Sequence, residues 1–332
     1  MSEIEHAAQL LREGKLVAFP TETVYGLGAD ASNPQAVRRI FAVKGRPADH
    51  PVIVHVHDAG DLGRWAREIP PSADRLTARF WPGPLTLVLK RAAGVIDEVT
   101  GGQDTVGLRC PSHPIAQELL RVFGGGIAGP SANRFGRISP TTAQHVRDEL
   151  GDAVELVLDG GACEVGIEST ILDLSAGVPT LLRPGRIGAA EIESVVGVPV
   201  ARAGAQSPRV SGSLEAHYAP QLPLLLAASI DLDRVVREQS ALRPVAVLAR
   251  HARPRDSRSA LWQIAATDAQ AYAHDLYALL RFIDRSGCAM IVVEAPPERP
   301  EWDAVRDRLM RAAAASGSGR VREGTKGAAQ GL

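Results

Sequence analysis

Residues 16–30 read LVAFPTETVYGLGAD. Residues 16–20 are a short apolar run that predicts a buried strand, and the polar segment Thr21 to Thr23 follows it directly. From spacing alone, we expect the next residues to form a tight turn with Gly26 and Gly28 at positive φ. Hydroxyls and a carboxylate at a strand end lie where open α/β sheets bind ligands. This stretch therefore predicts an α/β fold with a polar site at the end of a strand.

The same alternation of strands and helices continues to residue 200. Helical spacing of apolar residues predicts helices at 4–13, 34–43, 72–80, 114–123 and 141–150. Short apolar or β-branched runs predict strands at 51–57, 85–91, 105–109, 127–130, 156–159, 170–174 and 180–183. The close spacing of strands after residue 150 indicates some antiparallel pairing. Residues 1–200 are thus expected to form one α/β domain with a mixed sheet.

A change of composition predicts a second, smaller domain. Residues 201–223 are rich in Ala, Gly, Ser and Pro, which is typical of a linker. Beyond it, strands are predicted at 222–228, 244–249 and 289–294, with helices at 268–285 and 302–315. We expect a small βαβ-type domain over 224–315, and a disordered tail over 316–332 because that segment is rich in Gly, Ser and Ala and is charged.

Composition excludes several classes of protein. A net charge of −1 over 332 residues argues against a chain that binds polyanions along its whole surface. There is no run of about 18 apolar residues and no basic, apolar leader, so no membrane segment or secretory signal is predicted. Cys110, Cys163 and Cys288 suit neither a disulfide framework nor a zinc site, and we expect a cytoplasmic protein. His55 and His57 share a strand face without a third ligand, so no metal site is predicted.

Cations and hydroxyls recur at the ends of the predicted strands. Lys44 and Arg46 lie on a Gly/Pro loop after a helix, and two such cations can clamp a phosphate group. Arg109 and Arg183 each end a strand, where a guanidinium can bind a carboxylate. Ser139 can also cap the helix that follows Pro140. Walker A and G-x-S-x-G motifs are absent, and the G-x-G-x-x-A pattern from Gly26 is a weak dinucleotide fingerprint because no continuous apolar strand precedes it.

Taken together, the motifs resemble the YrdC-like family, in particular its long-form threonylcarbamoyl-AMP synthases. The matching blocks occur in family order at residues 20–27, 44–47, 81–86, 129–133, 168–170, 182–185 and 217–220. The resemblance implies a twisted mixed-sheet domain with a large cavity and a small Rossmann-like C-terminal domain. It also implies synthesis of threonylcarbamoyl-AMP from L-threonine, bicarbonate and ATP, for the threonylcarbamoyladenosine modification of tRNA next to the anticodon.

The resemblance also assigns site residues. Positions matching those that hold L-threonine are Thr23, His55, Arg109, Gly129 and Ser169. Positions matching those around ATP are Lys44, Arg46, His50, Thr105, Ser131, Ser139, Arg183, His217 and Tyr218, with Lys44 and Arg46 expected to be catalytic. Mg2+ is expected to arrive with ATP rather than at a dedicated protein site. Proteins that transfer the threonylcarbamoyl group to tRNA are the expected downstream partners.

Three other functions stay open from the sequence. Arg38, Arg39, Lys44 and Arg46 could form a patch that binds double-stranded RNA, or makes a weak RNA contact beside the enzymatic function. A carbamoyl-transfer subunit is the second alternative, although no zinc-finger-like or acylphosphatase-like region accompanies the domain. NAD-dependent chemistry is the third, and the poor fingerprint weakens it.

Overall fold

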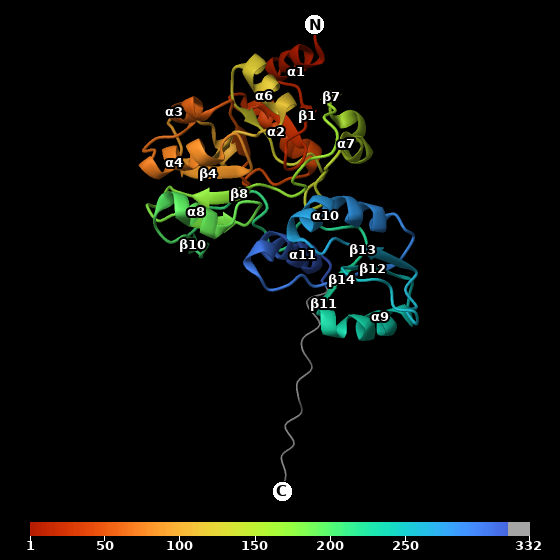
Figure 1. The fold of residues 1–332 in the computed structure, drawn as a ribbon. Coiled ribbons are helices and arrows are strands. Elements are labelled where there is room, and N and C mark those ends of the chain that lie inside the picture. The colour runs from red at the N-terminus through yellow and green to blue at the C-terminus, as the bar shows by residue number, and fades with distance from the viewer. Residues whose placement is uncertain (318–332) are drawn as a thin grey trace.

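A computed structural model describes residues 1–317, which form two α/β bodies (Figure 1). Of the predicted tail 316–332, residues 318–332 lie outside this range. Between the two bodies the chain runs from β10 (Ala201–Arg202) to β11 (Leu224–Ala227). The expected linker 201–223 thus begins with a strand, because β10 pairs in parallel with β9 (Thr180–Arg183) at the edge of the first sheet.

The first body contains a ten-stranded mixed sheet with the order β10-β9-β8-β4-β5-β3-β6-β2-β1-β7. Its remaining strands are β1 (Val17–Phe19), β2 (Gly26–Asp30), β3 (Ile53–His55), β4 (Leu85–Lys90), β5 (Thr105–Arg109), β6 (Ile127–Ala128), β7 (Leu156–Val157) and β8 (Thr170–Asp173). β8 and β9 pair antiparallel, which confirms the pairing expected after residue 150. The mixed α/β fold is likewise confirmed.

The predicted turn at Gly26 and Gly28 is wrong. These residues lie in β2, which pairs antiparallel with β1, and neither has a positive φ. Both glycines instead make room for the ring of Phe19. A Cβ atom at Gly26 would lie 3.1 Å from Cε1 and Cζ of this ring, and one at Gly28 would lie 3.0 Å from the same Cε1. Glycine here permits close packing rather than an unusual backbone conformation.

Helices cover the sheet of the first body. They are α1 (Glu3–Arg12), α2 (Pro34–Lys44), α3 (Leu62–Trp65), α4 (Pro71–Phe80), α5 (Asp97–Thr100), α6 (Pro114–Phe123), α7 (Ala143–Leu150) and α8 (Ala189–Val196). For α2, the residues at each end explain where the helix begins and ends. Asn33 accepts hydrogen bonds from two backbone N–H groups at its start, Pro34 occupies the first turn, and Gly45 ends it at φ 64°. This geometry places Lys44 and Arg46 at the end of the helix.

The second body is a four-stranded parallel sheet with the order β11-β14-β12-β13. Its other elements are β12 (Val245–Ala249), β13 (Leu261–Ile264), β14 (Met290–Glu294), α9 (Leu232–Ser240), α10 (Ala269–Asp284) and α11 (Asp303–Ala315). Short 3₁₀ helices lie at Ala59–Asp61, Gly151–Ala153, Ser229–Asp231 and Pro300–Trp302. The expected small parallel domain is confirmed, with β13 and α9 as elements that the periodicity missed.

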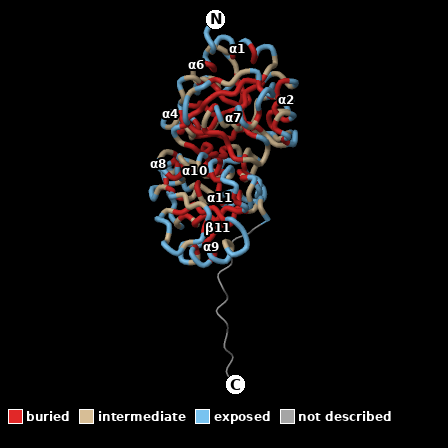
Figure 2. Tube along the Cα trace, turned by 90° about the vertical axis from the view of Figure 1, so that its right-hand side faces the viewer, coloured by how far each residue is buried: buried red, intermediate tan, exposed pale blue. Residues whose placement is uncertain are grey.

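The two bodies share a buried interface. Val24, Ile138 and Ile167 of the first body lie in one apolar cluster with Tyr277 and the core of the second. At its border, Arg281 of α10 pairs with Glu149 of α7. Figure 2 shows buried residues running from the first sheet through this interface, while outer helix faces are exposed. In residues 1–317, no helix has the length and apolar character needed to cross a membrane.

Candidate active site

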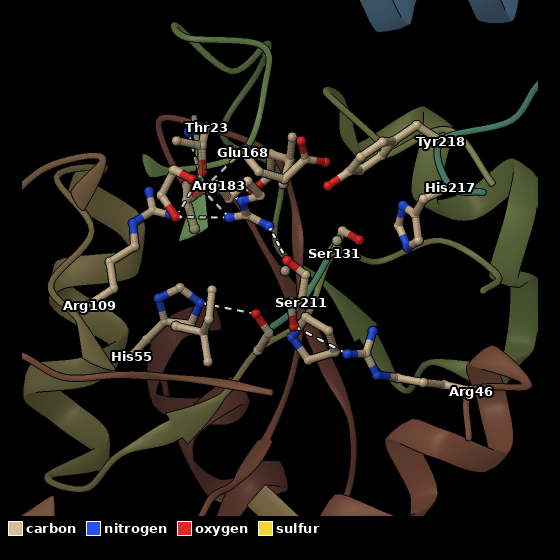
Figure 3. Close-up of a pocket in the computed structure, with 18 residues that line it drawn as sticks. Thr23, Arg46, His55, Arg109, Ser131, Glu168, Arg183, Ser211, His217 and Tyr218 are labelled. Atoms are coloured by element: carbon tan, nitrogen blue, oxygen red, sulfur yellow. Dashed lines mark hydrogen bonds between the residues drawn. The ribbon is translucent and has the colours of Figure 1, made fainter. Parts of the chain in front are cut away.

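A cavity lies at the ends of β3, β5 and β9 of the first body (Figure 3). The segment after β1, the loop after β6 and residues 211–218 of the linker complete its walls. All five residues assigned to L-threonine line it: Thr23, His55, Arg109, Gly129 and Ser169. Of those assigned to ATP, Arg46, Ser131, Arg183, His217 and Tyr218 also line it.

Four of the residues assigned to ATP lie elsewhere. Thr105 lines a neighbouring slot, while Lys44, His50 and Ser139 are not among the lining residues of either space. His50 is half-buried, and its ring packs edge-on against Phe135 at 5.4 Å between centroids. Ten of the fourteen predicted residues therefore line one cavity, and the other four lie outside its lining.

Arg109 is held in place before any ligand binds. Its Nη2 lies 2.7 Å from Glu22 Oε1, and its Nη1 donates to Thr23 Oγ1 at 2.8 Å. Glu22 Oε2 in turn accepts the backbone N–H of Ser112. Because both members of the pair are buried, the carboxylate neutralises the arginine and fixes the direction of its planar fork. Glu22 was not assigned to the site from sequence, although it lies inside the block at residues 20–27.

The His55 ring is neutral at the cavity wall, with one nitrogen as a donor and the other as an acceptor. Its Nε2 lies 3.1 Å from the carbonyl oxygen of Gly129, so this nitrogen carries the proton and donates. Burial and the charge of Arg109 lower the pKa of His55 to about 3. The buried Nδ1 has no hydrogen-bond partner and is left as an acceptor. Gly129 is required here, because a Cβ atom would lie 2.6 Å from the histidine ring.

Arg46 and Arg183 point toward one place in the cavity. Arg46 Nη2 donates to Ser211 Oγ at 3.2 Å, and Arg183 Nη1 donates to the carbonyl oxygen of Ser211 at 2.8 Å. Arg183 also donates to the carbonyl oxygen of Ser169. Burial lowers the pKa of Arg46 to about 10, which leaves it charged at neutral pH. Two guanidinium groups therefore converge on two oxygen atoms of one linker residue.

Lys44 does not point into the cavity. Its Nζ is buried and donates to the carbonyl oxygens of Ser131 (2.6 Å) and Asn133. Burial and the nearby Arg46 lower the pKa of Lys44 well below its ordinary value. In this structure Lys44 therefore holds the loop that carries Ser131.

Ser139 contacts a buried carboxylate that joins the two bodies. Its hydroxyl donates to Glu168 Oε1 at 2.5 Å, while Tyr277 of α10 and Arg308 of α11 donate to Oε2 at 2.9 and 2.7 Å. The prediction that Ser139 caps the following helix is wrong: Thr142 is the N-cap of α7. Burial alone would raise the pKa of Glu168, but the charges of Arg308 and Arg183 and the bond from Ser139 lower it to about 2.

The linker closes one side of the cavity. His217 and Tyr218 are buried, and Figure 3 shows Tyr218 reaching toward the cavity. Tyr218 has φ 61°, which is unusual for a bulky residue. Its ring stacks on Tyr277, and the guanidinium of Arg308 lies 5.1 Å from its centroid. The second body thus fixes an unusual linker conformation over the site.

Within residues 1–317, no group of three or more His, Cys, Asp or Glu side chains could hold a metal ion. The carboxylates nearest the cavity, Glu22 and Glu168, are already paired with arginines. The donor set therefore does not fit a metal site built from protein ligands alone, although it leaves open a metal carried by a nucleotide's phosphates.

Comparisons with known proteins agree with this architecture. The Sua5/YciO/YrdC family model, described as "Telomere recombination", matches residues 9–185. A model described as "Threonylcarbamoyl-AMP synthase, C-terminal domain" matches residues 187–314. Curated relatives named "Threonylcarbamoyl-AMP synthase" include one from Pyrococcus abyssi, 40% identical over 93% of this chain and 94% of the relative, and one from Bacillus subtilis, 39% identical over 94% and 93%.

Among solved structures, that of P. abyssi Sua5 complexed with L-threonine matches with a TM-score of 0.88 and 38% identity. The match covers 96% of each chain. Both bodies and their order therefore have counterparts in one relative. The chain belongs to the Sua5/YciO/YrdC family, in the two-domain form that carries the threonylcarbamoyl-AMP synthase C-terminal domain.

Proposed function

We propose that this protein is a threonylcarbamoyl-AMP synthase, an enzyme that joins L-threonine, bicarbonate and ATP into threonylcarbamoyl-AMP and pyrophosphate. One observation carries the proposal. A single cavity brings the buried guanidinium of Arg109 together with those of Arg46 and Arg183, and surrounds them with hydroxyl groups. Such a cavity suits two anionic substrates that must react with each other.

The chemistry needs two anions to approach. The neutral amine of threonine captures CO2, supplied by bicarbonate, and becomes an N-carboxylate with release of a proton. An oxygen of this carboxylate attacks the α-phosphorus of ATP, and the bond to the β-phosphate oxygen breaks as pyrophosphate leaves. Because a carboxylate is a poor nucleophile toward a polyanion, catalysis comes chiefly from positioning and charge neutralisation.

Several residues in and around the cavity have a role in this proposal. The fork of Arg109, aligned by Glu22, binds the carboxylate of threonine. Thr23, Ser169 and the free Nδ1 of His55 orient its polar groups. Arg46 and Arg183 bind phosphate oxygens in the place that Ser211 takes in this structure. Lys44 supports them by holding the Ser131 loop, and a direct contact with phosphate would require its Nζ to leave two carbonyl oxygens.

Mg2+ enters this proposal as part of the Mg–ATP substrate. It would offset charge on the phosphate oxygens, while Arg46 and Arg183 hold those oxygens from the protein side. Ser211 must move away when the phosphates bind. Residues 217 and 218 then remain as a wall that keeps water from the mixed anhydride, which hydrolyses readily.

The wider role follows the same proposal. The product would pass to proteins that transfer the threonylcarbamoyl group to tRNA, in the cytoplasm. The RNA-binding alternative is less favoured, because Arg38 and Arg39 of its patch are engaged by Glu98 and Glu155. Buried Lys44 and Arg46 are not available to a surface ligand either.

The test is direct. Purified protein is incubated with Mg–ATP, bicarbonate and each amino acid in turn, while pyrophosphate and the adenylate product are followed, the latter by mass. We expect pyrophosphate release only with threonine, and an adenylate with the mass of threonylcarbamoyl-AMP. Release that ignores threonine, or salt-dependent RNA binding without any release, would argue against the proposal.

A further inference from the structure

A second space opens beside the cavity, and apolar side chains form much of its wall. This slot shares Ile53 and Ser211 with the cavity. Its apolar lining consists of Val52, Ile53, Val88, Ile171 and Val210. Thr105 and Gln103 are the polar side chains at its β5 end. A largely apolar lining with a few placed polar groups is typical of a small-molecule site.

Gln103 presents its amide to this slot in a fixed orientation. Its Nε2 donates to the carbonyl oxygen of Thr100 at 3.3 Å and to that of Arg209 at 3.0 Å. Its Oε1 accepts the backbone N–H of Arg209 at 2.8 Å. The amide is therefore paired in a bidentate manner with one peptide group. The contact with Thr100 prevents the amide from exchanging its donor and acceptor ends.

Three successive linker residues occupy the positions that the parts of a nucleotide would take in the two spaces. Ser211 places two oxygen atoms between Arg46 and Arg183. Val210 packs against the apolar residues of the slot. Arg209 offers one N–H and one carbonyl group to Gln103. These three features correspond to phosphate oxygens, the face of a base and the edge of a base.

We propose that Gln103 recognises the adenine edge of ATP, and that the peptide group of Arg209 takes the place of that edge when no nucleotide is bound. The inference rests on the proposed function and adds to it the residue that selects the base. Adenine carries an amino donor beside a ring-nitrogen acceptor, and a glutamine amide pairs with that pattern through two hydrogen bonds. On nucleotide binding, the backbone of Arg209 leaves Gln103 and the base edge replaces it.

The two ends of the product would then lie along one strand. Arg109 and Thr105 are at opposite ends of β5, about 13 Å apart at the usual rise of a strand, and their side chains share a face. Gly107 lies between them on this face without a side chain, and it lines the slot. On this face of β5, no side chain at position 107 therefore separates the proposed threonine carboxylate site from the proposed base site.

Inosine triphosphate tests this inference sharply. Its base differs from adenine at position 6, where a carbonyl oxygen replaces the amino group that Gln103 Oε1 would accept from, and at N1, which becomes an N–H. An amide that cannot exchange its ends pairs well with adenine and poorly with hypoxanthine. We expect the wild-type kcat/KM for ATP to exceed that for inosine triphosphate by about 5- to 150-fold.

The variant Gln103→Met keeps the length of the side chain and removes both hydrogen bonds. Because Gln103 is half-buried, the variant is expected to fold. The ratio of its kcat/KM for ATP to that for inosine triphosphate should fall toward one, because activity with ATP is lost. The KM for threonine should stay unchanged. Arg209→Ala is the matched control. It removes side-chain contacts with Gly101 and Asp49 but keeps the peptide group on Gln103, so it should retain the preference.

Two outcomes would overturn the inference. One is a wild-type preference that survives in Gln103→Met, and the other is an equal loss with both nucleotides, which would indicate that Gln103 only holds the linker. Failure of the proposed function would look different, because the wild type would then release no pyrophosphate with threonine. In that case calorimetric binding of ATP and of inosine triphosphate still decides: equal affinities for the wild type would refute base recognition by Gln103.

Discussion

Replacing Arg308 by methionine removes a positive charge that contacts the buried carboxylate of Glu168. The methionine side chain can still pack against Tyr218, but Glu168 keeps only Ser139 and Tyr277 as neutral hydrogen-bond donors. Both members of the ion pair are almost inaccessible to water, with 1% and 8% of their side chains exposed. The substitution therefore removes the contacting partner of a buried carboxylate and leaves Arg183 as the remaining positive charge that lowers its pKa.

The size of the effect follows from the pKa of Glu168. The difference between its ordinary value of 4.5 and its value of about 2 in the protein corresponds to roughly 3 kcal/mol of stability. In the wild type this contribution is present above pH 4.5 and is lost as the pH falls toward 2. Breaking a buried pair by removing one partner costs about 3–5 kcal/mol. We therefore expect Arg308→Met to lose about that much at pH 7.

Urea unfolding at pH 7 and pH 5 measures the effect. Without Arg308, the pKa of Glu168 should rise, because only Arg183 and Ser139 then oppose the effect of burial, so the loss of stability should be smaller at pH 5. The double variant Arg308→Met, Glu168→Gln should regain most of the stability, because both charges of the pair are then removed. Arg306→Met is the control, since Arg306 forms a surface pair with Asp303 worth under about 1 kcal/mol. If Arg308→Met lost no more than this control, the reasoning would be refuted.

Three further predictions concern the cavity. In steady-state assays, Arg46→Ala should raise the KM for ATP about tenfold or more and leave the KM for threonine unchanged. Arg109→Lys keeps the charge but loses the planar fork, so it should raise the KM for threonine and leave the KM for ATP unchanged. Gly129→Ala should raise the KM for threonine by displacing the histidine ring at 2.6 Å, and Gly94→Ala, with open space around it, should not. Burial lowers the pKa of His217 to about 3, so between pH 6.5 and 3 the unfolded chain binds an extra proton there. In urea titrations, His217→Gln should therefore lose about 2 kcal/mol less stability than the wild type between pH 7 and pH 5.

Local patterns predicted most of the helices and strands, because each buries an apolar face of its own. They also predicted which strand ends carry hydroxyls and arginines. The glycines of β2 were misread because glycine serves turns and close packing alike, and only the position of Phe19 distinguishes the two. The contact between Arg308 and Glu168 joins residues 140 positions apart, so no local pattern contains it.

The same limit applies to Lys44. A lysine and an arginine on one loop predicted a phosphate clamp, but the ammonium group lies closer to backbone carbonyl oxygens than to the cavity. Which direction a long side chain takes depends on the loop opposite, and the sequence does not place that loop.

β6 is only two residues long, yet it joins the two halves of the larger sheet. On one side Ala128 pairs with Ala29 of β2, and on the other with Val54 of β3. Thr23 belongs to the first half, while His55 and Arg109 belong to the second. A brief opening of this narrow seam would separate the groups that hold one substrate, long before the protein as a whole unfolds. How long the site stays assembled therefore depends on a two-residue strand in the middle of the sheet rather than on the large core.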